Sequence, residues 1–252
     1  MKDRFTILEE ALKAQNLRGP LYYLPNAGNW GDGLIRYGTL KFFNDIKLNY
    51  KELPRRDKKS WMLPLLRGGT VIYGGGGGWC NLWNFSTKSV TKLNKRFNVI
   101  VLPSTYEFIY SIPGTNFFCR DLFESKQNMP DATFCHDMAF YIGKQFLGKG
   151  KGSGKGYFFR CDPESANKIK IPSNNNDISN KGNQLSNVSQ FFDEINRFEV
   201  IFTDRLHVSI AACLLEKEVH LYPGSYFKNR AVYMSSMKYN FENIHFHDKF
   251  DF

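Results

Sequence analysis

The sequence predicts an α/β fold with two unequal halves, each built on a parallel sheet. Short apolar runs of strand length alternate with helical patterns along the chain, and this alternation is typical of parallel α/β sheets. The stretch at residues 143–156 is rich in Gly and Lys, as expected for a linker or flexible loop. We therefore predict an N-terminal domain at residues 1–148 and a C-terminal domain at residues 149–252.

The first half opens with a short amphipathic helix, because Phe5, Leu8 and Leu12 recur at helical spacing. Five strands and two helices are expected after it. The strands are predicted at residues 21–24, 71–73, 98–102, 117–119 and 132–135, and the helices at residues 33–43 and 121–125. Ligands of parallel sheets bind beyond the carboxyl ends of the strands, so the loops that follow these strands are the places to look for function.

The second half repeats the alternation with fewer elements. Strands are predicted at residues 157–160, 199–202 and 219–222, and helices at residues 188–197, 208–216 and 228–237. The intervening residues 172–187 are rich in Asn and Ser, which predicts either a surface loop or a partly disordered segment.

Composition bounds the class of protein. With 34 Lys and Arg against 24 Asp and Glu among 252 residues, the chain carries a formal charge of +10. This charge either attracts a phosphorylated metabolite, an anionic membrane or nucleic acid, or only keeps the surface soluble. The sequence has no apolar run of spanning length and no signal-peptide pattern at its start. We expect a cytoplasmic protein, either free or bound peripherally at the inner membrane face.

The cysteines and the motifs indicate no metal or cofactor. The five cysteines are scattered, without a CxxC pair, which argues against a disulfide framework or a structural zinc site. The sequence shows neither metal-ligand spacing nor a nucleotide-binding fingerprint. The predicted chemistry therefore uses only the side chains of the protein.

Two glycine-rich loops follow predicted strands. The first contains Asn26, Gly28, Asn29 and Asp32, and its glycines would let backbone N–H groups approach an anion at a helix start. The alternative is a tight turn in which Asp32 caps the helix. The second loop runs from Gly74 to Gly78. Five glycines are costly to order, so either a ligand or a crossing chain must approach them, unless they form a flexible spacer. We favour a ligand at Gly75, Gly76 and Gly77.

Arginines and a histidine also stand at strand ends. Arg120 and Arg160 each follow an aromatic strand and precede acids, so each is either part of a site or a surface ion pair. Arg205 and His207 open a helix after a strand. Arg205 offers a fork for carboxylate or phosphate, and His207 can hold an anion or transfer a proton. Lys228 adds a further cation downstream.

Taken together, these motifs resemble those of the polysaccharide pyruvyl transferase family. The matching segments are NAGNWGDGLIRYG, VIYGGGGGW, VLPST, FFCRDLFES, HDMAF, RCDPE and TDRLHVSIAACLLEKEVHLYPGSYFKN, and they occur in the order of the family. One position departs from the pattern, since the acid Asp204 precedes Arg205 where a neutral residue is expected.

The resemblance implies an enzyme that moves the enolpyruvyl group of phosphoenolpyruvate onto two hydroxyls of a sugar or lipid-linked oligosaccharide, forming a pyruvate ketal and releasing phosphate. It also implies two Rossmann-like halves in a GT-B-like architecture with a cleft between them. Arg205 and His207 would line the donor pocket, with Asp32 and Asp137 as further acid/base candidates. The substrate-binding residues would be Asn26, Gly28, Asn29, Gly75, Gly76, Gly77, Arg120, Arg160, Lys228 and Asn229.

Two other functions stay open at this point. A nucleotide-sugar glycosyltransferase on the same architecture would bind a UDP- or GDP-sugar instead of phosphoenolpyruvate. A non-catalytic module that binds glycan or nucleic acid would use the basic surface and the Lys-rich residues 144–155. The cationic residues gather at strand ends and not along one helix face, so we expect no nucleic-acid partner.

Overall fold

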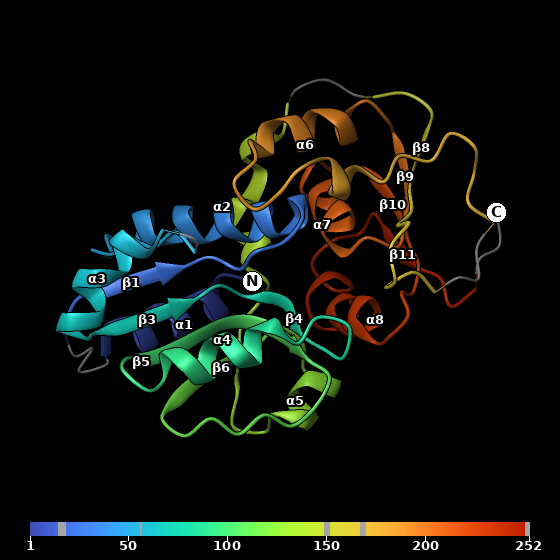
Figure 1. Ribbon diagram of the computed structural model, residues 1–252. Coiled ribbons are helices and arrows are strands. Elements are labelled where there is room, and N and C mark those ends of the chain that lie inside the picture. The colour runs from blue at the N-terminus through green and yellow to red at the C-terminus, as the bar shows by residue number, and fades with distance from the viewer. Residues whose placement is uncertain (15–18, 56, 149–151, 167–169, 250–252) are drawn as a thin grey trace. The chain divides into compact units, whose positions relative to one another are not determined.

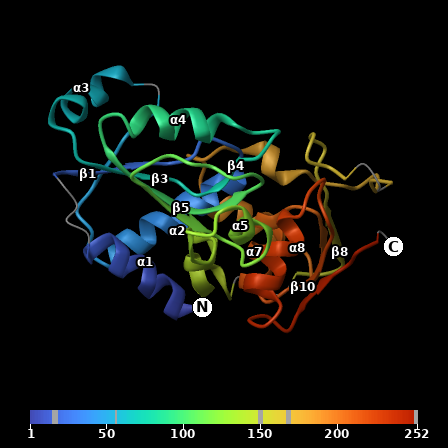
Figure 2. The ribbon, with the colours of Figure 1, turned by 90° about the horizontal axis from the view of Figure 1, so that it is seen from below.

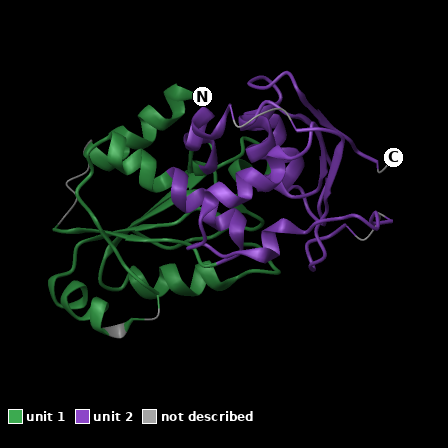
Figure 3. Ribbon diagram, turned by 90° about the horizontal axis from the view of Figure 1, so that it is seen from above, with its two compact units in different colours: residues 1–27, 39–138 green, residues 28–38, 139–252 purple. Residues whose placement is uncertain are grey.

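A computed structural model of the protein describes residues 1–14, 19–55, 57–148, 152–166 and 170–249. It contains helices and parallel sheets, which confirms the predicted α/β class. The chain forms two compact units (Figure 3). Unit 1 comprises residues 1–27 and 39–138, and unit 2 comprises residues 28–38 and 139–252. The sequence predicted residues 28–38 in the N-terminal domain, whereas in the structure they belong to unit 2.

Unit 1 is built on a seven-stranded parallel sheet with helices between its strands (Figure 1). The strand order is β2-β1-β3-β5-β6-β7, and β4 pairs with β5 off this path. In chain order the elements are α1 (Lys2–Ala14), β1 (Leu21–Leu24), α2 (Trp30–Asp45), β2 (Lys51–Glu52), α3 (Lys58–Arg67), β3 (Thr70–Tyr73), β4 (Gly76–Trp79), α4 (Phe85–Leu93), β5 (Asn98–Tyr106), β6 (Thr115–Cys119), α5 (Glu124–Asn128) and β7 (Thr133–Phe134).

Helices cover both faces of this sheet (Figure 2). Alternate residues of the central strands point to opposite faces. Val71 and Val99 pack with Val90 of α4 on one face. On the other face the Tyr23 ring packs edge-on against Phe43 of α2, with ring centroids 5.3 Å apart. The central strands are therefore buried on both sides, which explains why their sequences are almost continuously apolar.

Unit 2 contains a four-stranded parallel sheet in the order β11-β10-β9-β8. Helices α6 and α7 pack together, and α7 packs against β9 and β10. The elements are a 3-10 helix (Met138–Phe146), β8 (Lys155–Phe158), a second 3-10 helix (Ile178–Lys181), α6 (Val188–Asn196), β9 (Val200–Thr203), α7 (Leu206–Leu214), β10 (Glu218–Leu221), α8 (Lys228–Val232), a π-helical turn (Tyr233–Met237) and β11 (Ile244–Phe246).

The first turns of α2 belong to unit 2 because of an aromatic contact. The buried Trp30 ring lies edge-on to Phe191 of α6, with ring centroids 5.5 Å apart. Gly182 packs against the same indole so closely that a methyl group there would lie 2.5 Å from a ring carbon. Asn29 also forms an isolated bridge with Asn183. These contacts fix the glycine loop before α2 onto the second unit.

Most predicted elements are confirmed, with shifted ends. The strand at residues 21–24 is found as predicted, and α7 begins at Leu206, two residues before the predicted start. The residues at 172–187 include a 3-10 helix in which Ile178 is buried, where the sequence predicted only a loop. Helices α3 and α4 and strands β2 and β11 were not predicted from the sequence. Of the described helices, none is long and apolar enough to cross a membrane.

Candidate functional site

At Gly74 and Gly75 the glycine run packs closely against other parts of the chain, which is one of the alternatives that the sequence left open. A methyl group on Gly74 would lie 2.5 Å from the Asn26 backbone nitrogen, and one on Gly75 would lie 2.3 Å from the Pro103 carbonyl oxygen. Gly76 begins the strand β4, which pairs with β5. Backbone from neighbouring strands thus occupies the space of the missing side chains at Gly74 and Gly75. Ligand contacts of Gly75, Gly76 and Gly77 stay a prediction.

Arg120 lies inside unit 1, directly after β6. Its side chain is 1% exposed. The guanidinium donates to Asp137 Oδ2 at 2.6 Å and to Thr105 Oγ1 at 2.8 Å. Arg120 and Asp137 therefore form a buried ion pair, where the sequence allowed a site residue or a surface ion pair. Removing one partner of such a pair lowers the stability of the fold, because the other charge is left buried and unpaired.

Arg55, for which the sequence indicated no role, lies next to Asn26 in unit 1. Its Nε donates to the Pro25 carbonyl at 2.9 Å, and its Nη2 donates to the Tyr73 hydroxyl at 3.0 Å. The guanidinium also lies over the Tyr73 ring, 5.2 Å from its centroid. Asn26 itself is 5% exposed. Arg55 follows a two-residue charged strand instead of an apolar one, so the sequence carried no signal that it stands at the sheet edge.

In unit 2 the predicted cations do come together beyond the carboxyl ends of the parallel strands. Arg160 follows β8, Arg205 follows β9, and Lys228 follows β10 at the start of α8. Each of them is buried, and each contacts carboxylates. Arg160 donates to Asp162 at 2.8 Å and to Glu164, and Lys228 donates to the same Glu164 oxygen. The cluster is therefore a charge-balanced network.

Arg205 is the centre of this network. Its Nε and Nη2 donate to the two oxygens of Asp177 at 2.7 Å each. The same Nη2 lies 2.9 Å from Asp162 Oδ2. This bidentate geometry fixes the guanidinium plane. The Nη1 group of Arg205 donates to none of the described residues, so it is the part of the fork that remains available to a substrate.

Within the described residues, Asp204 forms no ion pair with Arg205, although the two are neighbours in the sequence. Its side chain is fully buried, and its Oδ1 accepts from the Arg160 backbone N–H at 2.8 Å. Burial raises the pKa of Asp204 to about 6. The side chain that caps the preceding turn is Thr203, whose Oγ1 accepts from the Arg205 N–H at 2.9 Å. Asn229 Nδ2 donates to the Asp204 carbonyl at 2.6 Å, so Asn229 serves the backbone here.

His207 lies beside the glycine loop that opens α2. A methyl group on Gly31 would lie 2.5 Å from His207 Nδ1, so only glycine allows this approach. Asn29 Oδ1 accepts from the Gly31 N–H at 2.8 Å and thereby caps the start of α2. The Asp32 carboxylate covers Gly28, where a methyl group would lie 1.9 Å from Oδ2. Asn29, and not Asp32, is therefore the capping residue.

Unit 2 thus brings together residues that are far apart in the sequence. The half-buried His207 imidazole stands in the first turn of α7, and its neighbours are the first residues of α2. A proton-transfer group, a carboxylate and two helix starts lie in one place, which suits a negatively charged substrate that must gain and lose protons. No group of His, Cys, Asp and Glu in the described part of the chain could hold a metal ion.

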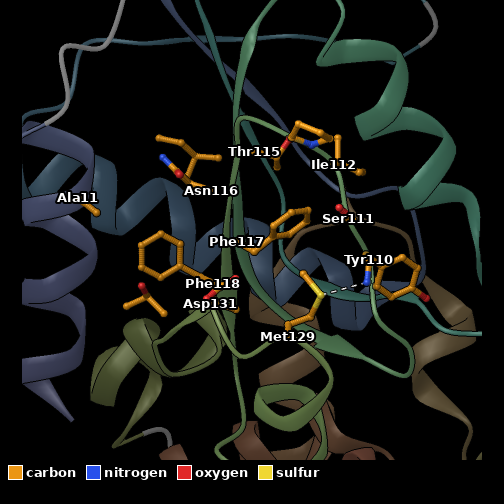
Figure 4. Close-up of a pocket in the computed structure, with 14 residues that line it drawn as sticks. Ala11, Tyr110, Ser111, Ile112, Thr115, Asn116, Phe117, Phe118, Met129 and Asp131 are labelled. Atoms are coloured by element: carbon orange, nitrogen blue, oxygen red, sulfur yellow. Dashed lines mark hydrogen bonds between the residues drawn. The ribbon is translucent and has the colours of Figure 1, made fainter.

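A cavity of about 400 Å³ lies elsewhere in unit 1, beside the start of β6 (Figure 4). Asn116 and Phe117 of β6 line it together with Tyr110 and Met129, and the Tyr110 N–H donates to the Met129 sulfur at 3.2 Å. None of the residues lining it belongs to the predicted site. It lies at the amino end of β6, whereas Arg120 follows the carboxyl end of that strand.

Comparison with known proteins bears on this site. A family model described as polysaccharide pyruvyl transferase matches residues 29–225. Among solved structures, the chain is similar to a functionally uncharacterized protein from Klebsiella pneumoniae. The two share 26% sequence identity with a TM-score of 0.79, over 98% of this chain and 100% of that one. A search of the curated proteins found no match. The family match includes Arg205, His207 and Asp32, whereas Asn26, Gly28, Lys228 and Asn229 lie outside it.

Proposed function

The chain belongs to the polysaccharide pyruvyl transferase family, and on that premise we propose that it transfers the enolpyruvyl group of phosphoenolpyruvate to a sugar. Two hydroxyls of a glycan or glycolipid precursor would accept it as a pyruvate ketal, with release of phosphate. The observation that carries the proposal is the contact of His207 with the glycine loop at the start of α2, because it sets an acid/base group beside two helix starts.

The donor binds to cations in this proposal. Phosphoenolpyruvate carries about three negative charges near neutral pH, so several donors must hold it. Arg205 offers its Nη1 group, while Asp177 and Asp162 hold the rest of the guanidinium in place. Arg160 and Lys228 act in the same network by fixing Asp162 and Glu164. The carboxylates of Asp162, Glu164 and Asp177 therefore orient the cationic side chains. The N–H groups that no carboxylate engages, such as Arg205 Nη1, bind the substrate.

The reaction needs one proton at carbon and loses two from oxygen. A general acid protonates the methylene carbon of the donor, which makes the adjacent carbon electrophilic. One sugar hydroxyl bonds to that carbon and loses its proton, and the carbon–oxygen bond to phosphate breaks. A second hydroxyl then bonds to the same carbon and loses its proton. One released proton restores the acid, and the other leaves with the phosphate.

His207 is the proposed general acid, and Asp32 is the proposed base for the acceptor hydroxyls. Both lie at the first turn of a helix in unit 2. Positioned side chains of this kind contribute about 10²- to 10⁴-fold to a rate. We further propose a GT-B-like architecture.

The test is the His207→Gln variant in a phosphate-release assay with phosphoenolpyruvate and a panel of glycosides. We expect a loss of at least about 100-fold in turnover. Gln keeps a polar side chain, so the fold should persist and is checked by circular dichroism. His245→Gln is the matched control, because His245 is an exposed histidine of β11 in the same unit. It should keep full turnover.

Unchanged turnover in His207→Gln would refute the assignment of the general acid. Absence of any phosphate release by the wild-type protein, with binding of a UDP- or GDP-sugar, would favour the glycosyltransferase alternative instead. The mass of the product separates the two reactions, because a ketal adds a pyruvate less one water and glycosyl transfer adds a sugar.

A further inference from the structure

Arg55 stands at the carboxyl edge of the seven-stranded sheet and has no acidic partner among the described residues. Its hydrogen bonds go to the Pro25 carbonyl, to Asn26 Oδ1 at 3.5 Å and to the Tyr73 hydroxyl. These three acceptors are neutral, and no carboxylate of the described residues lies within ion-pair distance of the guanidinium. The side chain is half-buried. A partly buried charge without a counter-charge is costly in the protein alone.

This sets Arg55 apart from the cations predicted from the sequence. Arg120 is paired with Asp137, Arg160 with Asp162 and Glu164, and Lys228 with Glu164. Arg205 is paired with Asp162 and Asp177. Those charges are already balanced by the protein. In the described part of the chain, the charge of Arg55 is held by neutral oxygens and by the face of the Tyr73 ring, so it is open to an external anion.

The contacts of Arg55 and Asn26 also fix the orientation of their remaining N–H donors. Asn26 Oδ1 lies within hydrogen-bond distance of both Arg55 Nη2 and the Tyr73 hydroxyl, which is 3.2 Å away. The Asn26 amide nitrogen is therefore turned away from both. Neither that nitrogen nor Arg55 Nη1 donates to any described residue. The Arg55 guanidinium and the Asn26 amide thus each keep N–H donors, and groups of this kind bind a carboxylate or phosphoryl oxygen.

The surrounding backbone holds these donors in place. The Tyr73 hydroxyl reaches Ser86 Oγ in the first turn of α4, at 3.1 Å. Gly78 packs against the same Ser86 and lies near the Asn26 amide, where a methyl group would be 3.3 Å from Nδ2. The glycine run thus permits Asn26, Tyr73 and α4 to meet, and through them it positions Arg55.

We propose that Arg55 and Asn26 form an anion-binding site in unit 1 that takes a carboxylate or phosphoryl group. This site goes beyond the proposed function and does not rest on it. Arg55 is a binding residue that the sequence did not indicate, and Asn26 acquires a specific role in place of a general one in a glycine loop.

The experiment measures binding of inorganic phosphate, pyruvate and phosphoenolpyruvate to the full chain by calorimetry. The informative variant is Asn26→Asp, which places a carboxylate against Arg55 and neutralises it without removing the arginine. Arg55→Gln removes the charge directly. The matched control is Arg96→Gln, which loses the same charge from an exposed arginine in unit 1. We expect binding at least about tenfold weaker in Asn26→Asp and Arg55→Gln, and unchanged in the control.

Asn26→Asp separates lost binding from lost folding, because its new ion pair should keep or raise the melting temperature in the absence of anion. Comparison of phosphate with pyruvate tells whether the site takes a phosphoryl group or a carboxylate. Equal affinities in the wild-type protein and both site variants would overturn the proposal, and so would the absence of binding to the wild-type protein at millimolar anion.

The outcomes for the site and for the proposed function are distinguishable. If the site variants lose anion binding while the wild-type protein releases no phosphate from phosphoenolpyruvate, the anion site stands and the proposed reaction fails. If the wild-type protein releases phosphate and both site variants bind inorganic phosphate as the wild-type protein does, the reaction stands and the site fails.

Discussion

At the scale of single residues, Asp204 explains how an acid can stand directly before a candidate substrate-binding arginine. The carboxylate turns away from Arg205 and accepts from the Arg160 backbone N–H. Its Oδ2 is buried and receives no hydrogen bond from the described residues. Burial therefore dominates and raises the pKa to about 6, in spite of the nearby arginines. The acid links the loop after β8 to the loop after β9.

The raised pKa of Asp204 predicts a pH dependence of stability that Asp204→Asn removes. Between the unfolded pKa of 3.8 and the folded pKa of about 6, the folded state binds the proton and the unfolded state does not. The free energy of unfolding therefore falls as pH rises through this window, by at most about 3 kcal/mol. Urea unfolding at pH 4 and pH 7 should show this fall for the wild-type protein relative to the variant.

Asn at this position can still accept the Arg160 N–H, so the contact that orders the loop is preserved. Parallel pH profiles of the two proteins would show that Asp204 does not titrate in this range. The difference between the profiles, and not the absolute stability of either protein, is the quantity to compare.

At the scale of elements, the glycine run shows that glycine serves the close packing of the chain. Gly75 packs against the Pro103 carbonyl, and Gly78 packs so tightly that a methyl group would lie 2.2 Å from Ser86 Oγ. The run ends in the strand β4, which pairs with β5. Glycine is needed where backbone meets backbone, and this requirement looks in the sequence like a loop that cradles a ligand.

Gly75→Ala should destabilise the protein because the new methyl group meets rigid backbone. We expect a loss of about 3 kcal/mol in the free energy of unfolding, at the upper end for overpacking. Gly114→Ala is the comparison, since Gly114 has open space around it and a φ of 75°. That change should cost only roughly 1–2 kcal/mol of backbone strain. Unchanged stability in Gly75→Ala would contradict the packing explanation and restore the ligand-facing one.

At the scale of the whole molecule, the net charge of +10 does not identify the site. The cations of unit 2 that stand at strand ends are offset by Asp162, Glu164 and Asp177. Unit 1 keeps an arginine held by neutral partners. The donors available to an anion are therefore single groups on fixed arginines, and surface charge contributes mainly to long-range attraction.

Phosphoenolpyruvate should raise the melting temperature of the chain, because a ligand that binds the folded state stabilises it by mass action. At 100 times the dissociation constant the stabilisation is about 2.7 kcal/mol, which corresponds to roughly 5 °C or more for a chain of this size. Differential scanning fluorimetry with phosphoenolpyruvate, and with a UDP-sugar in parallel, measures the shift. No shift at millimolar phosphoenolpyruvate would contradict the donor assignment.

The sequence by itself determined the α/β class, most strands and the grouping of cations at strand ends, because burial on both faces of a parallel sheet demands apolar runs that are visible in the chain. It also placed Arg205 and His207 at the start of α7. Tertiary structure alone decided which charges are already paired, since Asp177 reaches Arg205 from a polar stretch with no periodic pattern. It alone brought Arg55 to Asn26 and His207 to Gly31, because such meetings depend on strand order and close packing that no local pattern encodes.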